Sequence, residues 1–287
     1  MKRNEAVGLP SIVIEPIVRA ALAEDLGRAG DITTDAIISP EARARAVMAA
    51  RKRGVVAGLD AAAMAFRLLD PEVRIEAVRR DGDTVEAGGA IAVVAGRARS
   101  LLSAERVALN FLCRLSGIAT ATRALVDAVT GYPVRICDTR KTTPGLRALE
   151  KYAVRVGGGV NHRFGLDDGV LLKDNHIAVA GGIREAVERA RRNLGHMVKI
   201  EVEVDRLDQI GEALAAGADV IMLDNMTTAQ MREAVATIRG RAIVEASGRI
   251  TAENAPAIAA TGVDMISAGW ITHSAPILDI GLDFEGE

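Results

Sequence analysis

The sequence predicts an α/β protein in which an antiparallel sheet is followed by a barrel of repeated strand and helix units. Two observations predict the barrel. Short apolar segments recur after residue 133, and each is followed by a polar or glycine-rich turn and then a helical pattern, which indicates parallel strands with right-handed crossovers. Each segment also ends in a residue suited to chemistry, as expected where barrel strands converge on one mouth. The predicted strands are 134–137, 170–172, 199–204, 220–223, 242–244 and 265–267.

A doubly wound parallel sheet is the alternative to the barrel, because it is also built from strand and helix units. Such a sheet brings together only the residues near the point where its strand order reverses. Here residues suited to chemistry end every strand of the series, and this distribution favours the barrel.

The first part of the chain is expected to contain a short helix and a sheet. Pro16 opens a pattern of apolar residues at helical spacing, which ends near Gly27. From 46 to 96, apolar or alternating runs are separated by Asp-Gly and Gly-Gly turns. This pattern predicts antiparallel strands, with 73–78 and 90–94 as examples.

Two further helices are predicted on either side of the first barrel strand. The longer one covers 101–129 and links the two halves, with Gly117 as a possible break. The shorter one has Thr143 as its expected N-cap and Pro144 in its first turn. Its predicted buried face consists of Leu146, Leu149, Ala153 and Val156.

Composition and charge restrict the function classes. Hydrophobic residues make up 49% of the chain and aromatic residues 2%, so the core must consist mainly of aliphatic side chains. A net charge of -2 gives no global electrostatic reason to bind nucleic acid or an anionic membrane. Two cysteines do not suggest a secreted disulfide framework, and no apolar run long enough for a signal peptide or a membrane span follows the charged N-terminus. We therefore expect a soluble, cytoplasmic protein.

Cations are concentrated in the segment that follows the first barrel strand. Three successive glycines at 157–159 allow the backbone to approach a ligand closely, and they lead directly to His162. A lone basic turn is usually a solvated surface feature, and a lone histidine is often structural. Together, however, these residues predict an anion-binding mouth, because guanidinium and ammonium groups match carboxylate and phosphate. The cations are Arg140, Lys141, Arg163 and Lys173.

Two carboxylates follow the cations at the ends of consecutive strands. Glu203 and Asp224 can hold Mg²⁺, hydrogen-bond ribose hydroxyls or stabilise developing positive charge. An ion pair with a neighbouring lysine or arginine is the structural alternative. Glu201 competes with Glu203 because strand alternation places both on one face, but Glu203 lies nearer the mouth.

Glycine-containing turns follow the last two strands and precede predicted helices. Ser247 and Gly248 form the first turn, and Ala268 and Gly269 form the second. Barrels commonly bind phosphate at such positions through backbone N–H groups. The two turns together predict a site for a terminal monophosphate.

Several motifs resemble those of the quinolinate phosphoribosyltransferase family, and they match in order along nearly the whole chain. The motifs are Glu24 to Gly27, Asp31 to Thr34, Ala104 to Asn110, Thr139 to Gly145, Gly157 to Arg163, Leu172 to His176, Leu223 to Asn225 and Thr272 to Ser274. The resemblance implies that quinolinate and phosphoribosyl pyrophosphate react, with Mg²⁺, to give nicotinate mononucleotide, pyrophosphate and carbon dioxide.

The resemblance also implies a fold and an assembly. An N-terminal α/β sandwich would comprise 1–115, joined by the C-terminal segment 275–287, and an incomplete, seven-stranded α/β barrel would comprise 116–274. The family implies a homodimer with active sites shared between subunits, possible assembly of dimers into a higher oligomer, and a role for Arg106 in the neighbouring subunit's site. From the sequence pattern alone, Arg106 reads as an exposed helix residue.

Roles carry over to the matched positions. The resemblance implies that Lys141, Glu203 and Asp224 are catalytic, with Lys141 mainly on phosphate and the two carboxylates on ribose and metal. Contacts to the dicarboxylate or pyrophosphate fall to Arg140, His162, Arg163 and Lys173, with Thr139 also binding substrate. Contacts to the 5′-phosphate fall to Ser247, Gly248, Ala268 and Gly269. Trp270 departs from the family pattern, which usually has a small residue there.

Three rival functions stay open at this level. A Schiff-base lyase would use Lys173 or Lys199, but it would explain neither the paired carboxylates nor the many cations. A divergent relative associated with molybdenum uptake would share the local motifs and act on another substrate. A barrel that only binds phosphorylated anions would not need both Glu203 and Asp224.

Overall fold

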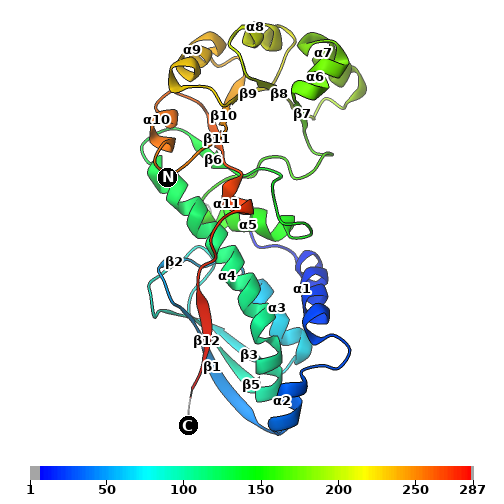
Figure 1. Ribbon diagram of the computed structural model, residues 1–287, viewed down its shortest axis with the longest axis vertical. Helices are drawn as coiled ribbons and strands as arrows, with labels where there is room; N and C mark the ends of the chain where they lie inside the picture. Colours follow the sequence, from blue (N-terminus) through cyan, green and yellow to red (C-terminus); the bar gives the residue numbers. More distant parts are fainter. Residues whose placement is uncertain (1–6, 286–287) are drawn as a thin grey trace. The chain divides into compact units, whose positions relative to one another are not determined.

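The computed structural model describes residues 7–285, and the charged N-terminal residues considered above lie outside this range. The chain divides into two compact units (Figure 1). The first, here called the N-terminal unit, contains the residues up to Arg123, Thr142–Gly158 and the residues from Thr272 onward. The second, here called the barrel unit, contains Ala124–Lys141 and Gly159–Ile271. The two units therefore alternate along the sequence.

The N-terminal unit is built on an antiparallel sheet, as the sequence predicts. Its strand order is β12-β1-β5-β3, so β1 pairs with β5 on one side and with β12 on the other. The short strands β2 and β4 pair with each other in a separate ribbon. The strands are β1 (Arg43–Ala50), β2 (Gly54–Val55), β3 (Arg74–Ala77), β4 (Thr84–Val85), β5 (Ala90–Arg97) and β12 (Ile280–Phe284).

The N-terminal unit also contains helices, wholly or in part. They are α1 (Ser11–Leu26), α2 (Ile32–Ile37), α3 (Leu59–Leu69), α4 (Ala98–Ala128) and α5 (Arg147–Gly157), and the last residues of α4 belong to the barrel unit. The predicted start of α1 at Pro16 is wrong, because the helix begins at Ser11 and Pro16 lies inside it. Its end at Gly27 is confirmed, and Ile14 and Val18 are buried at helical spacing where α1 contacts α3.

The long helix α4 is continuous, so the possible break at Gly117 is not found. A different constraint explains this glycine. A Cβ atom at position 117 would lie 2.2 Å from the carbonyl oxygen of Pro276 and 2.8 Å from Cα of Ile277. The C-terminal segment therefore passes too close to α4 for any larger residue.

The predicted start of α5 is also wrong. Thr143 is not its N-cap, because the helix begins at Arg147 after a turn. Thr143 instead donates its hydroxyl to Glu150 at 2.7 Å, and its backbone N–H donates to the same carboxylate at 3.1 Å. Glu150 is fully buried and also accepts hydrogen bonds from Arg114. A buried ion pair thus replaces the expected cap.

The barrel unit contains one parallel sheet of the strands predicted from the sequence. Its order is β6-β11-β10-β9-β8-β7, so from β7 to β11 each strand lies beside the next one in sequence, and β6, the first strand, lies beside β11, the last. No reversal of strand order occurs, which excludes a doubly wound sheet. The strands are β6 (Arg135–Cys137), β7 (Val170–Leu172), β8 (Ile200–Val204), β9 (Val220–Asp224), β10 (Ile243–Ser247) and β11 (Met265–Ser267).

An incomplete barrel is therefore confirmed, and its sheet has six strands within the described residues where the family resemblance implies seven. On the open side of β6, Val160 forms a parallel bridge with Cys137 and occupies the place of a further strand. The helices α6, α7, α8 and α9 lie outside the curved sheet in Figure 1. The helices of this unit are α6 (Asp174–Ala180), α7 (Ile183–Asn193), α8 (Asp208–Ala215), α9 (Thr228–Ile238), α10 (Ala255–Ala259) and α11 (Trp270–His273, which ends in the N-terminal unit).

Strand alternation gives the barrel sheet an apolar face and a polar face. Along β8, Ile200 and Val202 are fully buried on one face of the sheet, and the helices α7 and α8 contact this strand. Glu201 and Glu203 point to the opposite face, toward the barrel interior. The interior therefore contains carboxylates. Across the described residues, no helix combines the length and the apolarity needed to cross a membrane.

Gly117→Ala should destabilise the protein, although alanine normally stabilises a helix interior. We expect the free energy of unfolding to fall by about 1–3 kcal/mol, because the new methyl group overlaps the backbone near Pro276. Urea unfolding followed by circular dichroism measures the change.

Gly211→Ala in α8 is the matched control, because its Cβ meets nothing within 4 Å. It should raise the free energy of unfolding by about 0.5–1 kcal/mol. Equal stabilisation by both substitutions would contradict the close contact at Gly117.

Candidate active site

The carboxyl ends of the parallel strands lie level with one another and form one mouth. Asp224 pairs in register with Ser247, Ser247 with Ser267, and Ser267 with Cys137. The polar residues that follow these strands are therefore brought together at one edge of the sheet. All of the predicted site residues except Arg106 lie in the barrel unit.

Asp138 holds the loop after β6 to the segment that carries His162. Its carboxylate is fully buried and accepts the side-chain N–H of Asn161 at 2.7 Å and the backbone N–H of His162 at 2.8 Å. Because a buried carboxylate needs such donors, the two segments are fixed together. Asp138 directly follows the predicted strand 134–137, but no binding role was predicted for it from the sequence.

Two guanidinium groups lie close together beside this anchor. Burial and the positive charge of Arg140 lower the pKa of Arg163, although it stays protonated at neutral pH. Arg163 also donates to the carbonyl oxygen of Gly169 at 2.9 Å. The next cation, Lys141, is exposed, and its backbone N–H donates to the hydroxyl of Thr139 at 3.0 Å. Like charges held this close attract an anion.

Lys173 and Glu203 form an ion pair across neighbouring strands. Their positions follow from the register, since Leu172 of β7 pairs with Val202 of β8. The lysine side chain is 46% exposed and that of Glu203 16% exposed, so the pair lies at the mouth rather than in the core. The structural alternative raised from the sequence, an ion pair, is therefore present in this structure.

Asp224 ends β9 and accepts a hydrogen bond from the Asn225 side chain at 2.7 Å. The next turn fits tightly against this asparagine. Gly248 has a φ of +101°, and a Cβ there would lie 2.3 Å from Oδ1 of Asn225. Only glycine combines this backbone conformation with this approach. The backbone of the turn after β10 is therefore held against the end of β9.

The turn after β11 contains Ala268 and Gly269. Ala268 is buried, and its backbone N–H donates to the carbonyl oxygen of Cys137 at 3.0 Å. Trp270 follows, and its indole Nε1 is buried without a hydrogen-bond partner among the described residues. This donor distinguishes the turn from one with a small residue at position 270.

A second charged group lies deeper in the barrel. The side chains of His162, Glu201 and Glu245 bring potential metal-ligating atoms within 4.8 Å of one another. Nε2 of His162 lies 2.9 Å from Oε2 of Glu201 and 3.8 Å from Oε1 of Glu245. Glu201 therefore lies beneath the mouth, and Glu203 lies at the mouth.

Glu245 was missed by reasoning from the sequence. A signal existed, because it is a charged residue in the middle of the otherwise apolar strand β10. Such a residue is almost never fully buried without a partner, so its position in a barrel strand indicates a polar interior.

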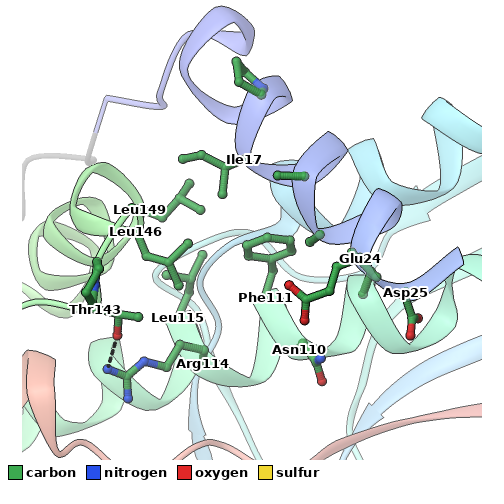
Figure 2. Close-up of a pocket in the computed structure, with 16 residues that line it drawn as sticks. Ile17, Glu24, Asp25, Asn110, Phe111, Arg114, Leu115, Thr143, Leu146 and Leu149 are labelled. Atoms are coloured by element: carbon green, nitrogen blue, oxygen red, sulfur yellow. Dashed lines mark hydrogen bonds between the residues drawn. The ribbon is translucent and has the colours of Figure 1, made fainter. Parts of the chain in front are cut away.

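Arg106 lies in the N-terminal unit, on the exposed side of α4. One turn later, Asn110 lines a groove between α1 and α4 with a volume of about 630 Å³. Figure 2 shows Ile17, Phe111 and Leu115 on its apolar walls, and Glu24 and Asp25 on its α1 side. Arg106 therefore lies on the same helix as the groove, whose surface is partly apolar and partly charged.

Comparisons with known proteins agree with this arrangement. The model of the quinolinate phosphoribosyl transferase C-terminal domain matches residues 118–283, and that of the N-terminal domain matches residues 31–116. A Bacillus subtilis protein named "Probable nicotinate-nucleotide pyrophosphorylase (carboxylating)" is 50% identical over 260 residues, covering 91% of this chain and 89% of that protein. Its Mycobacterium leprae counterpart, nicotinate-nucleotide pyrophosphorylase (carboxylating), is 46% identical over 274 residues, covering 93% and 95%.

The fold of the chain also resembles that of solved structures. The nicotinate-nucleotide pyrophosphorylase from Francisella tularensis superposes with a TM-score of 0.93 at 40% identity, covering 98% of this chain and 99% of that one. Both halves of the sequence, the sheet topology and the charged mouth thus point to one family. The chain belongs to the quinolinate phosphoribosyltransferase family.

Proposed function

We propose that the chain catalyses the transfer of a phosphoribosyl group from phosphoribosyl pyrophosphate to quinolinate, giving nicotinate mononucleotide, pyrophosphate and carbon dioxide in NAD biosynthesis. The observation that supports this proposal is that cations lie beside carboxylates at the mouth of the barrel. Lys173 pairs with Glu203 there, and Asp224 ends the next strand. The substrates are polyanions whose reaction develops positive charge on the ribose, so both signs of charge are needed.

The cations bind the anionic groups of both substrates. Arg140 and Arg163 present planar guanidinium groups suited to the carboxylates of quinolinate, with Thr139 and His162 beside them. Exposed Lys141 suits a pyrophosphate oxygen, because an ammonium group on a flexible stem can follow the departing charge. Lys173 now pairs with Glu203, and it binds the dicarboxylate or the pyrophosphate when that anion takes the place of Glu203.

Glu203 and Asp224 are proposed to serve the ribose and the metal. Their carboxylates hydrogen-bond ribose hydroxyls and stabilise the positive charge that develops at the anomeric carbon. Both residues are only partly buried, which fits Mg²⁺, since this ion keeps several waters and needs few protein carboxylates. When bound with phosphoribosyl pyrophosphate, Mg²⁺ neutralises pyrophosphate charge. Either direct or water-mediated contacts satisfy this donor set.

The two last turns are proposed to hold the 5′-phosphate. Gly248 keeps its turn open to a close backbone approach, and Ser247 adds a hydroxyl donor. Ala268 and Gly269 supply the second turn, although the Ala268 N–H is already used within the barrel. The buried indole N–H of Trp270 lies next to this turn and is a further donor for a phosphate oxygen.

Loss of carbon dioxide requires the two quinolinate carboxylates to be treated differently. The carboxylate that is lost must receive fewer hydrogen bonds than the other, so that its negative charge can move to the ring carbon as the bond breaks. Positive charge is unevenly distributed over the mouth, with two guanidinium groups, Arg140 and Arg163, on one side and the largely buried His162 on the other. This gradient supports the proposed selectivity.

We also propose a homodimer in which each mouth is completed by Arg106 of the other subunit. Arg106 is exposed on α4 beside a groove that combines apolar walls with Glu24 and Asp25, and such mixed surfaces are typical of interfaces. Association of dimers into larger oligomers is compatible with this arrangement. A cytoplasmic location is proposed from the reduced, buried state of Cys113 and Cys137.

The purified protein should form nicotinate mononucleotide from quinolinate only when phosphoribosyl pyrophosphate and Mg²⁺ are both present. The reason is that the ribosyl group comes from phosphoribosyl pyrophosphate, and that Mg²⁺ is proposed to neutralise pyrophosphate charge together with Lys141. Chromatography of the product and release of carbon dioxide measure the reaction. Absence of product at high enzyme concentration would rule out the proposed activity.

Asp224→Asn should lower kcat by about 10²–10³-fold while leaving the fold intact, because a fixed negative charge at the ribosyl centre is removed. Asp219→Asn is a control at the opposite end of the same strand, where Asp219 pairs with Arg191 and Lys199 away from the mouth. It should change stability more than kcat. Equal kcat in Asp224→Asn and the wild type would remove Asp224 from the catalytic group.

Inactive Arg106→Ala should regain activity when it forms mixed dimers with inactive Lys173→Ala. Each mixed dimer contains one intact site of two, so purified mixed dimers should show about half of wild-type activity. Co-expression with two affinity tags provides the mixed dimers for assay. Mixing Lys173→Ala with Asp224→Asn should restore nothing, because both changes lie in the barrel unit; recovery there, or none with Arg106→Ala, would refute the shared site.

A further inference from the structure

Beneath the mouth lies a buried group of charged residues that the proposed mechanism does not use. Glu201 is 6% exposed and Glu245 3% exposed, and they lie on β8 and β10 with β9 between them. Both point into the barrel, where His162 reaches down to meet them. Buried carboxylates are costly, so this arrangement calls for a specific role.

The hydrogen bonds of His162 determine where its ring proton lies. The backbone N–H of Arg163 donates to Nδ1 at 2.8 Å, so Nδ1 must keep its lone pair. The ring proton therefore lies on Nε2, which is 2.9 Å from Oε2 of Glu201 and donates to it. With one nitrogen accepting and the other donating, the imidazole is neutral.

The same geometry argues against a metal ion at this place. A metal bound to Nε2 would need the lone pair of that nitrogen and would leave the ring proton on Nδ1. A proton on Nδ1 would face the N–H of Arg163, which is directed at the same atom. The hydrogen-bonded arrangement of His162 and Glu201 is thus favoured over metal ligation by these residues.

Glu245 completes the arrangement behind Glu201. One carboxylate oxygen of each residue, Oε1 in both cases, is buried without a hydrogen-bond partner. A proton on Glu245 would leave one buried negative charge here in place of two. Burial and the charge of Glu201 raise the pKa of Glu245 to about 7, the direction that favours a proton on this carboxyl group.

We propose that Glu201 and Glu245 are positioning residues, in which Glu201 holds His162 as the neutral Nε2–H tautomer and Glu245 supports Glu201. The proposal rests on the proposed function of the mouth above it. Together with Asp138, which holds the backbone N–H of His162, Glu201 clamps the 161–163 segment from two sides. Arg163 is thereby presented to the anion in one geometry.

Nuclear magnetic resonance of ¹⁵N-histidine tests the tautomer without any assay of activity. The chain has four histidines, and the His162 signals are those that disappear in His162→Gln. At pH 7 the wild-type protein should show a protonated Nε2 and an unprotonated Nδ1 at His162. A ring protonated on Nδ1 alone, or on both nitrogens, would overturn the proposal.

Addition of Zn²⁺ is the second arm of this experiment. The His162 signals should not change, because its Nε2 lone pair is not available. Loss of the Nε2 proton with bound Zn²⁺ would show a metal site and overturn the hydrogen-bonded assignment. If His162→Gln does not fold, single substitutions of the three exposed histidines, His176, His196 and His273, assign the remaining signals to His162.

Steady-state kinetics tests the link to the mouth. Glu201→Ala should raise KM for quinolinate about tenfold with a much smaller change in kcat, because a supporting partner of the anion-binding segment is lost. Glu201→Gln keeps an acceptor for Nε2–H and should recover most of the affinity. Glu245→Gln should also retain the Nε2–H tautomer, since its neutral amide replaces a carboxyl group that is neutral when it carries a proton.

Glu233→Ala, at an exposed position on α9, is the matched control and should leave KM unchanged. An unchanged KM in Glu201→Ala, or an equal loss in Glu201→Gln and Glu201→Ala, would overturn the positioning role. If the wild-type protein transferred no phosphoribosyl group, the proposed function would fail, whereas the histidine spectrum would still decide the tautomer.

Discussion

The hydrogen bonds of Asp138 hold the candidate site together. This carboxylate is fully buried at the end of β6 and binds the side chain of Asn161 and the backbone of His162. It therefore joins the loop that carries Arg140 to the segment that carries Arg163, although the two are separated by α5 in the sequence. Without this anchor, the two guanidinium groups would lie on independent loops, and their mutual repulsion would separate them.

The barrel interior differs from an ordinary hydrophobic core. Apolar residues such as Ile200 and Ile221 form the layer between strands and helices, and this layer supplies the stability. The interior is then free to contain Glu201, Glu245 and the more exposed Glu203. Two layers with separate tasks explain how one short strand, β8, serves the core on one face and the chemistry on the other.

Much of this architecture follows from the sequence, because alternation, turn residues and strand ends are local properties. The six parallel strands and the antiparallel sheet were predicted on these grounds. The errors concern contacts between distant segments. Gly117 reads as a helix breaker, yet it is required by a backbone at Pro276, and Thr143 reads as a cap, yet it binds Glu150. The partners of Asp138 and Glu245 are equally invisible before the strands are placed side by side.

The pairing of β12 with β1 has a consequence for synthesis of the chain. Strand β1 is made early, but its neighbour on one side, Ile280–Phe284, is made only after the whole barrel unit. During translation the edge of β1 is therefore exposed for as long as the whole barrel takes to emerge, and exposed edges favour aggregation. The strand order of the sheet thus makes completion of the first unit wait for synthesis of the second.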